Sequence, residues 1–280
     1  MINFEKFCND ELINNVLYEL KNELDGNKIF ISEADLQFSF AKKLYELQDK
    51  NINNIILEYP ITTEFLYSQA QTEHINEIKK YLNKRMCNSC KDKDDYCSYY
   101  CNKFQDKYSA SKESIDLLFK YEDTYYFIEF KYKSDKIKDS VCRYSDILCN
   151  EFYLKMHGAD DLGRYSVYED LERLENIKKV AKTKNAKCKA FIIFITNHKA
   201  YWSLNQTEGK LASNMPLATG DKYNSIKYTK NGELYFGNEN NATKRRTLFV
   251  ENQYELHWNN FKTLDKTIEN TLFKCLVIEL

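Results

Sequence analysis

Two neighbouring segments rich in Ile, Phe and Tyr most constrain the fold of this chain, because together they predict a β-hairpin. Residues 114–120 and 125–133 carry the apolar and aromatic side chains that strands favour, and a short polar segment between them supplies a turn. Side chains alternate between the two faces of a strand, so Glu129 and Lys131 share one face, about 6–7 Å apart. Pairing of the two strands brings Asp116 beside them.

These charged groups predict a metal site. Desolvated charges need partners, and a divalent cation would supply one for a pair of carboxylates. Asp116 and Glu129, with the backbone carbonyl of Phe130, form a hard-oxygen ligand set of the kind that suits Mg2+ or Mn2+. The Lys131 ammonium would then stabilise a metal-bound hydroxide and the charge on a scissile phosphate. The alternative is an ordinary amphipathic strand whose charged residues face water.

The spacing of these residues resembles a known catalytic motif. Asp116, twelve intervening residues and then Glu129, Phe130 and Lys131 are similar to the PD-(D/E)XK nuclease superfamily, which includes restriction, repair, recombination and phage-defence nucleases. Ile115 stands where the motif name has Pro, at a position without a chemical role. The resemblance covers the chain from about residue 32 to about residue 197. It implies an α/β fold of the restriction-endonuclease-like kind, with a mixed central sheet flanked by helices.

The resemblance also implies a function, namely a Mg2+-dependent endonuclease that hydrolyses phosphodiester bonds of DNA in restriction or phage defence. Asp116 and Glu129 would hold the ion, and Lys131 would support the attacking water. A homodimer suits this activity, because two-fold symmetry serves the cutting of two antiparallel strands. Two other readings remain open: a non-catalytic nucleic-acid-binding or assembly protein with a zinc knuckle, and an RNA-directed nuclease that uses the same residues.

An upstream segment predicts a helix that could reach the same site. Ser32 is a good N-cap, Asp35 lies at the third helical position, and apolar residues follow at helical spacing. The superfamily commonly places a Glu of its first core helix near the metal, so Glu33 is the candidate fourth acidic residue. Glu33 fits equally well as a simple complement to the helix dipole. Asp35 is expected to cap the helix rather than to bind metal.

Four of the nine cysteines lie in one short segment, at Cys87, Cys90, Cys97 and Cys101. Two closely spaced pairs are what tetrahedral thiolate coordination requires, and the charged residues between the pairs offer no apolar core. We therefore expect a structural Zn2+ site in an insertion at about residues 86–104. An iron–sulfur cluster uses the same ligands and is the less favoured alternative. Disulfides and unligated cysteines are the remaining readings.

The remainder of the chain predicts helices, one central strand and a β-rich C-terminal part. Segments 136–156 and 166–182 have helical periodicity, and the uninterrupted apolar run 190–195 is typical of a central strand. The nuclease core is expected to span residues 1–200, and residues 201–280 are expected to form an extension packed on it. The extension is predicted to contain short strands at residues 233–236, 247–250 and 254–258 and a terminal helix within residues 262–280.

A polar group surrounds the second of these helices. It consists of Arg164, Tyr165, Asp170, Arg173 and Glu175. Charged residues three or four positions apart favour a salt-bridge network on the helix face. Contact of Arg164 or Arg173 with phosphate is the alternative.

Composition limits the partners and the location of the protein. With 43% hydrophobic residues and no apolar stretch of about 18 residues, the chain is expected to be a globular cytoplasmic protein without a membrane span or signal peptide. The net charge of −1 argues against a nucleic-acid partner, since Lys and Arg drive phosphate binding. Local basic clusters, such as residues 244–246, keep DNA open as a partner. Seven glycines and no glycine-rich phosphate loop predict no nucleotide cofactor.

Overall fold

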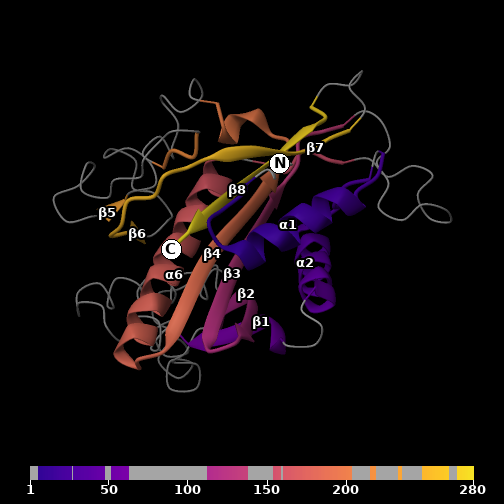
Figure 1. Cartoon of the computed structure of the whole chain (residues 1–280). Coiled ribbons are helices and arrows are strands. Elements are labelled where there is room, and N and C mark those ends of the chain that lie inside the picture. Colours follow the sequence, from indigo (N-terminus) through magenta and orange to yellow (C-terminus); the bar gives the residue numbers. More distant parts are fainter. Residues whose placement is uncertain are drawn as a thin grey trace, which may run out of the picture.

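A computed structural model shows a mixed α/β architecture in which a six-stranded sheet is flanked by helices (Figure 1). The predicted mixed sheet is therefore confirmed at this level of the architecture. The structure describes residues 6–26, 28–47, 52–62, 112–137, 154–158, 160–203, 215–218, 233–234, 248–264 and 270–280. The elements in these ranges are α1 (Glu11–Glu23), α2 (Glu33–Leu47), β1 (Asn53–Thr62), β2 (Lys112–Tyr121), β3 (Thr124–Lys133), α6 (Asp160–Thr183), β4 (Lys187–Thr196), the 3-10 helix η2 (Lys199–Tyr201), β5 (Glu233–Leu234), β6 (Leu248–Phe249), β7 (Trp258–Thr263) and β8 (Leu272–Glu279).

The main sheet has the strand order β1-β2-β3-β4-β8-β7. β3 and β4 are parallel to each other, and every other neighbouring pair in this sheet is antiparallel. Parallel neighbours need a crossover connection, and α6 forms part of the connection from β3 to β4. This crossover places α6 against the face of β3 and β4 opposite to α1 and α2 (Figure 1).

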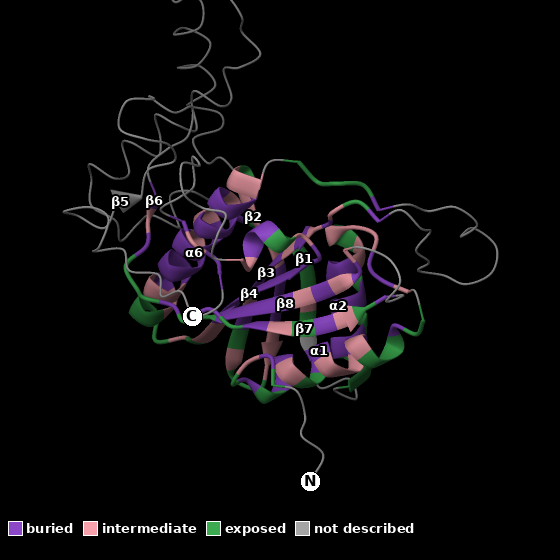
Figure 2. Cartoon of the chain, turned by 90° about the horizontal axis from the view of Figure 1, so that it is seen from above, coloured by how far each residue is buried: buried purple, intermediate pink, exposed green. Residues whose placement is uncertain are grey.

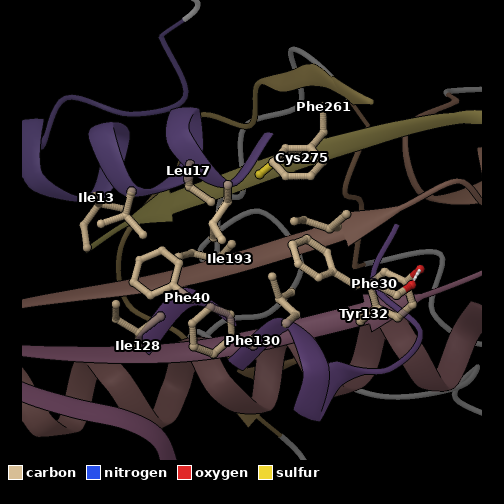
Figure 3. Close-up of a cluster of buried hydrophobic side chains, with 14 of the residues drawn as sticks. Ile13, Leu17, Phe30, Phe40, Ile128, Phe130, Tyr132, Ile193, Phe261 and Cys275 are labelled. Carbon is tan, nitrogen blue, oxygen red and sulfur yellow. Dashed lines mark hydrogen bonds between the residues drawn. The ribbon is translucent and has the colours of Figure 1, made fainter. Parts of the chain in front are cut away.

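Alternate residues of β4 are buried in two different cores. Phe191, Ile193 and Ile195 belong to the core beneath α1 and α2, part of which is drawn in Figure 3. The residues between them, such as Ile192 and Phe194, belong to the core beneath α6. Burial on both faces explains why an apolar run without period-two alternation forms the central strand, as predicted. In Figure 2 this strand is buried along most of its length.

The start of α2 agrees with the sequence. The backbone N–H of Asp35 donates to Ser32 Oγ at 3.1 Å, and Asp35 Oδ2 accepts the Ile31 N–H at 3.1 Å. Ser32 is therefore the N-cap, and Asp35 closes the cap from the third helical position. The prediction that Asp35 caps the helix is confirmed.

The C-terminal part differs from the prediction in two places. The terminal helix expected within residues 262–280 is wrong, because β8 occupies Leu272–Glu279 and pairs with both β4 and β7. The strand expected at residues 254–258 begins instead at Trp258, the first residue of β7. β8 is buried on both faces, so its sequence lacks the alternation by which a half-buried strand is recognised. Its inward residues are Phe273, Cys275 and Val277 in the core beneath α1 and α2, and Leu276 and Ile278 in the core beneath α6.

Two further predictions concern residues that the structure leaves largely undescribed. The segment with Cys87, Cys90, Cys97 and Cys101, and with it the expected Zn2+ site, lies outside the described residues. So does most of the helix expected at residues 136–156, although its described ends, 136–137 and 154–156, are not helical. None of the helices in the described ranges is long and apolar enough to cross a membrane.

Candidate active site

The predicted hairpin is present, and its two strands separate at the end where the charged residues lie. The ladder between β2 and β3 runs from Tyr121 opposite Thr124 to Leu117 opposite Ile128. Beyond this point β2 continues along β1, and β3 continues along β4 as far as Lys133. A gap therefore opens between the two strands where β2 carries Asp116 and β3 carries Glu129.

Asp116 places its carboxylate in this gap. Its Oδ2 accepts the backbone N–H of Phe130 at 2.6 Å. Burial raises the pKa of Asp116 to about 6, although the bond from Phe130 and the charge of Lys131 act in the opposite direction. None of the ion pairs that the described residues form in this site includes Asp116. Among the described residues, no cation therefore forms an ion pair with this partly desolvated carboxylate.

Glu129 is almost completely buried, with 1% of its surface exposed. Its Oε1 accepts from Arg173 Nη1 of α6 at 2.5 Å. Burial raises the pKa of Glu129 well above its usual range, Arg173 offsets part of this effect, and the carboxylates of Asp170 and Asp116 add to it. The fold therefore holds Glu129 where its charged form is disfavoured, and the adjacent Arg173 offsets this only in part.

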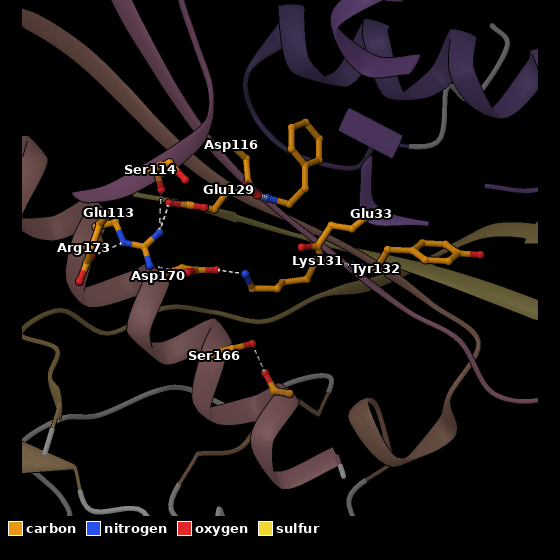
Figure 4. A network of polar contacts seen from close by, with 12 residues as sticks. Glu33, Glu113, Ser114, Asp116, Glu129, Lys131, Tyr132, Ser166, Asp170 and Arg173 are labelled. Atoms are coloured by element: carbon orange, nitrogen blue, oxygen red, sulfur yellow. Dashed lines mark hydrogen bonds and ion pairs between the residues drawn. The ribbon is translucent and has the colours of Figure 1, made fainter. Parts of the chain in front are cut away.

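Lys131 lies two residues beyond Glu129 on β3, and its side chain points to the same face of the strand (Figure 4). Its Nζ lies 2.7 Å from Asp170 Oδ2. Burial alone would lower the pKa of Lys131, but the surrounding carboxylates of Asp170, Glu129 and Glu33 outweigh burial and raise it. Lys131 is consequently a charged ammonium at neutral pH. It can stabilise negative charge in the site, whereas proton abstraction by this group is disfavoured.

Arg173 connects the two halves of the site. Its guanidinium pairs with Glu113 Oε2 at 3.0 Å, Glu129 Oε1 at 2.5 Å and Asp170 Oδ1 at 3.4 Å. Its Nη1 also donates to the backbone carbonyl of Ser114 at 3.2 Å. Figure 4 shows this network, in which β2, β3 and α6 each supply at least one group. The ion pairs fix the side chain of Glu129 from the helix side.

Glu33 also reaches the site, from the first turn of α2. Its Oε2 accepts the backbone N–H of Tyr132 at 2.9 Å, one residue beyond Lys131. Its charge contributes to the raised pKa values of both Asp116 and Lys131. Glu33 lies in the first turn of α2, where it complements the helix dipole, and it is not among the residues that line the cavity between Asp116 and Arg173.

A cavity of about 200 Å³ opens where these groups meet, and five carboxylates and two cationic side chains line it. The carboxylates outnumber the cations, so the cavity attracts positive charge and repels a phosphate group unless a further cation is bound. The lining residues are Glu113, Ser114, Asp116, Glu129, Lys131, Glu169, Asp170 and Arg173.

The cavity is lined by oxygen donors of the kind that a divalent ion prefers. The described part of the chain contains no group of three or more His, Cys, Asp or Glu side chains that could hold a metal ion. The predicted ligand set is smaller, namely Asp116, Glu129 and a carbonyl. Because the N–H and C=O of one residue in an extended strand point to the same edge, Phe130 directs its carbonyl to the gap that its N–H faces. No ion pair among the described residues includes the Asp116 carboxylate, and Mg2+ takes few protein ligands and retains water.

The sequence did not assign Glu113, Asp170 or Arg173 to this site. For Asp170 and Arg173 it predicted a network on the helix face, which the pair at 3.4 Å confirms, but the network also extends to Glu129 and Lys131. The sequence does contain a signal for these contacts, because Asp170 and Arg173 directly precede the buried Leu171 and Leu174 of α6. Charged residues beside the apolar stripe of a buried helix need partners across the interface.

Two other members of the polar group on this helix have separate roles. Arg164 is 1% exposed and donates to the carbonyl of Ala200 in η2, and it does not line the cavity. Glu175 accepts the backbone N–H groups of Glu251 and Asn252 at 2.8 and 2.9 Å and so fixes the segment after β6. These contacts stabilise packing around α6.

Comparison of the chain with protein-family models, with curated proteins and with solved structures found no match to any of them.

Proposed function

We propose that this protein is a divalent-metal-dependent endonuclease of the PD-(D/E)XK type that hydrolyses phosphodiester bonds of DNA. One observation carries the proposal: Asp116, Glu129 and Lys131 converge on one cavity at the point where the strands of their hairpin separate. Chance surface charges on a strand would instead lie in water. Here Glu129 is buried and Lys131 is held by an ion pair, so the fold bears the cost of desolvating them.

Each residue has a role that follows from its contacts. Asp116 and Glu129, with the Phe130 carbonyl, would hold Mg2+ or Mn2+, which supplies a Lewis acid and an activated water when bound. Lys131 remains protonated and stabilises the charge that develops on the phosphate. Asp170 keeps the Lys131 ammonium in place, with Nζ at 2.7 Å from its Oδ2. Glu33 fixes the backbone beyond Lys131 through Tyr132.

The charge of the cavity also bears on substrate binding. Five carboxylates against two cations repel a phosphodiester, and a bound divalent ion reverses part of that repulsion. DNA should therefore bind at this site only with the ion present. This coupling distinguishes a hydrolytic site from a basic binding surface, which would hold DNA through Lys and Arg without metal.

The experiment is cleavage of plasmid and linear duplex DNA with Mg2+, Mn2+ or EDTA. Wild type is compared with Asp116→Ala and Lys131→Ala, and with Lys179→Ala as the matched control, since Lys179 pairs with Glu251 at the exposed side of α6. We expect metal-dependent cutting by wild type and the control and none by the two site variants. Cutting that survives Lys131→Ala would contradict the proposed site.

Parallel incubation with single-stranded and structured RNA tests the nearest alternative substrate. Cleavage of RNA alone would move the proposal to an RNA-directed nuclease with the same residues. Binding of DNA without cleavage, by folded wild type under every metal, would favour the non-catalytic binding protein. Within the nuclease proposal, restriction or phage defence is the proposed role, and sedimentation of the DNA complex tests the proposed homodimer.

A further inference from the structure

We propose that the Arg173 guanidinium takes the place of a second divalent cation in this site, so that the nuclease works with a single ion held by Asp116 and Glu129. The inference rests on the metal dependence proposed above. It concerns how many ions the site can hold, which the identity of the ligands alone does not determine.

The surroundings of Arg173 resemble a cation cage. The guanidinium is bound by three carboxylates, those of Glu113, Glu129 and Asp170, and by the backbone carbonyl of Ser114. Carboxylate and carbonyl oxygens are also the ligands that Mg2+ and Mn2+ take in proteins. A guanidinium stays protonated under all ordinary conditions, and its planar fork can bind several oxygens at once. Arg173 therefore supplies a permanent positive charge to these oxygen atoms.

Asp116 provides the contrast. Its Oδ2 accepts the Phe130 N–H at 2.6 Å, and none of the site's ion pairs among the described residues includes it. Of the two carboxylates predicted to bind metal, Glu129 has a cation in contact, whereas Asp116 has none among the residues that the structure describes. The charge that is still uncompensated thus lies on the side of the cavity away from Arg173, and this side is where one ion fits.

Glu129 lies between the Arg173 cage and the position proposed for the single ion. Two-metal sites hold their ions about 3.5–4 Å apart, commonly with a carboxylate between them. Here Glu129 lies between the Arg173 cage and the gap that holds Asp116, with one oxygen bonded to Nη1 at 2.5 Å. Arg173 therefore acts as a positioning residue that orients Glu129 toward the single ion. A second ion would have to displace the guanidinium from its carboxylates.

Metal binding measured without DNA tests this inference. The full chain is titrated with Mn2+ by calorimetry, and the bound ions are examined by electron paramagnetic resonance. We expect one bound ion per chain for wild type, with the spectrum of an isolated Mn2+. We expect two ions for Arg173→Gln, with the spin coupling of ions about 4 Å apart. Arg173→Lys, which keeps a cation in the cage, should bind one.

Lys179→Gln on the same helix is the control and should bind one ion, because Lys179 pairs with Glu251 outside the cavity. Circular dichroism confirms that each variant is folded. Two coupled ions in wild type, or one ion in a folded Arg173→Gln variant, would overturn the inference. If either of these results were found together with metal-dependent DNA cleavage, the inference would be wrong and the proposed nuclease function would still hold. One ion in wild type and two in the variant, without cleavage of any nucleic acid, would instead support the cation cage and reject the nuclease.

Discussion

The partly buried Asp116 carboxylate should destabilise the fold at neutral pH, and Asp116→Asn should therefore stabilise the metal-free protein. The pKa of Asp116 is raised from an ordinary value of 3.8 to about 6. Each pKa unit corresponds to about 1.4 kcal/mol, so holding the group ionised above pH 6 costs about 3 kcal/mol. An asparagine is neutral, and its side-chain oxygen can still accept the Phe130 N–H.

The sign of the pH dependence follows from proton linkage. Between about pH 4 and pH 6 the folded state retains a proton at Asp116 that the unfolded chain has already lost. Stability from this group therefore falls as pH rises through that window, and the loss is complete above the folded pKa. Below about pH 4 both states are protonated, and the substitution should have little effect.

Urea unfolding at pH 8 and at pH 4, without added divalent ion, measures the effect. We expect Asp116→Asn to gain up to about 3 kcal/mol at pH 8 and close to nothing at pH 4. Asp123→Asn, in the exposed turn of the same hairpin, is the matched control and should show no gain at either pH. A variant that is less stable than wild type at pH 8, or equally stabilised at both pH values, would refute the reasoning.

Two further substitutions test the contacts of α6. Asp170→Asn removes the charge that holds Lys131 and should lower the cleavage rate by about 10–100-fold, with a smaller effect on Mn2+ affinity, as rate and calorimetry together would show. Equal losses in both measurements would contradict a role through Lys131. Glu129→Ala removes the closest carboxylate of Arg173, which keeps Glu113 and Asp170, and should cost about 1.5–3 kcal/mol in urea unfolding, more than the same change at the exposed Glu122 of the hairpin turn.

The parts of the fold that the sequence predicted are those with a local pattern. The hairpin, the cap of α2 and the central strand each follow from residues that are close together in the chain, such as Ser32 with Asp35. β8 was missed because a strand buried on both faces carries no period-two signal, and its pairing with β4 joins residues far apart in the sequence. Only the packing of the whole sheet determines that pairing.

The site residues also divide into those predicted from a local pattern and those that depend on long-range contacts. Asp116, Glu129 and Lys131 could be predicted because one hairpin carries all three. The bond between Arg173 and Glu129 spans 44 positions, and it exists because α6 crosses β3 on the way to β4. A sequence pattern shows which face of that helix is apolar, but it does not show which strand residue each flanking charge will meet.

The partners that α6 supplies also determine how the fold should respond to loss of metal. Glu129 and Lys131 have ionic partners in Arg173 and Asp170, whereas no ion pair among the described residues includes Asp116, so removing Mg2+ affects mainly Asp116. We therefore expect metal-free protein to keep its helices and strands by circular dichroism. Added Mg2+ should raise the unfolding free energy of wild type, by about 2.7 kcal/mol at a hundredfold excess over the dissociation constant, and should not stabilise Asp116→Asn to that extent. Collapse of the secondary structure on removal of Mg2+ would mean that the ion, rather than α6, compensates the buried charges.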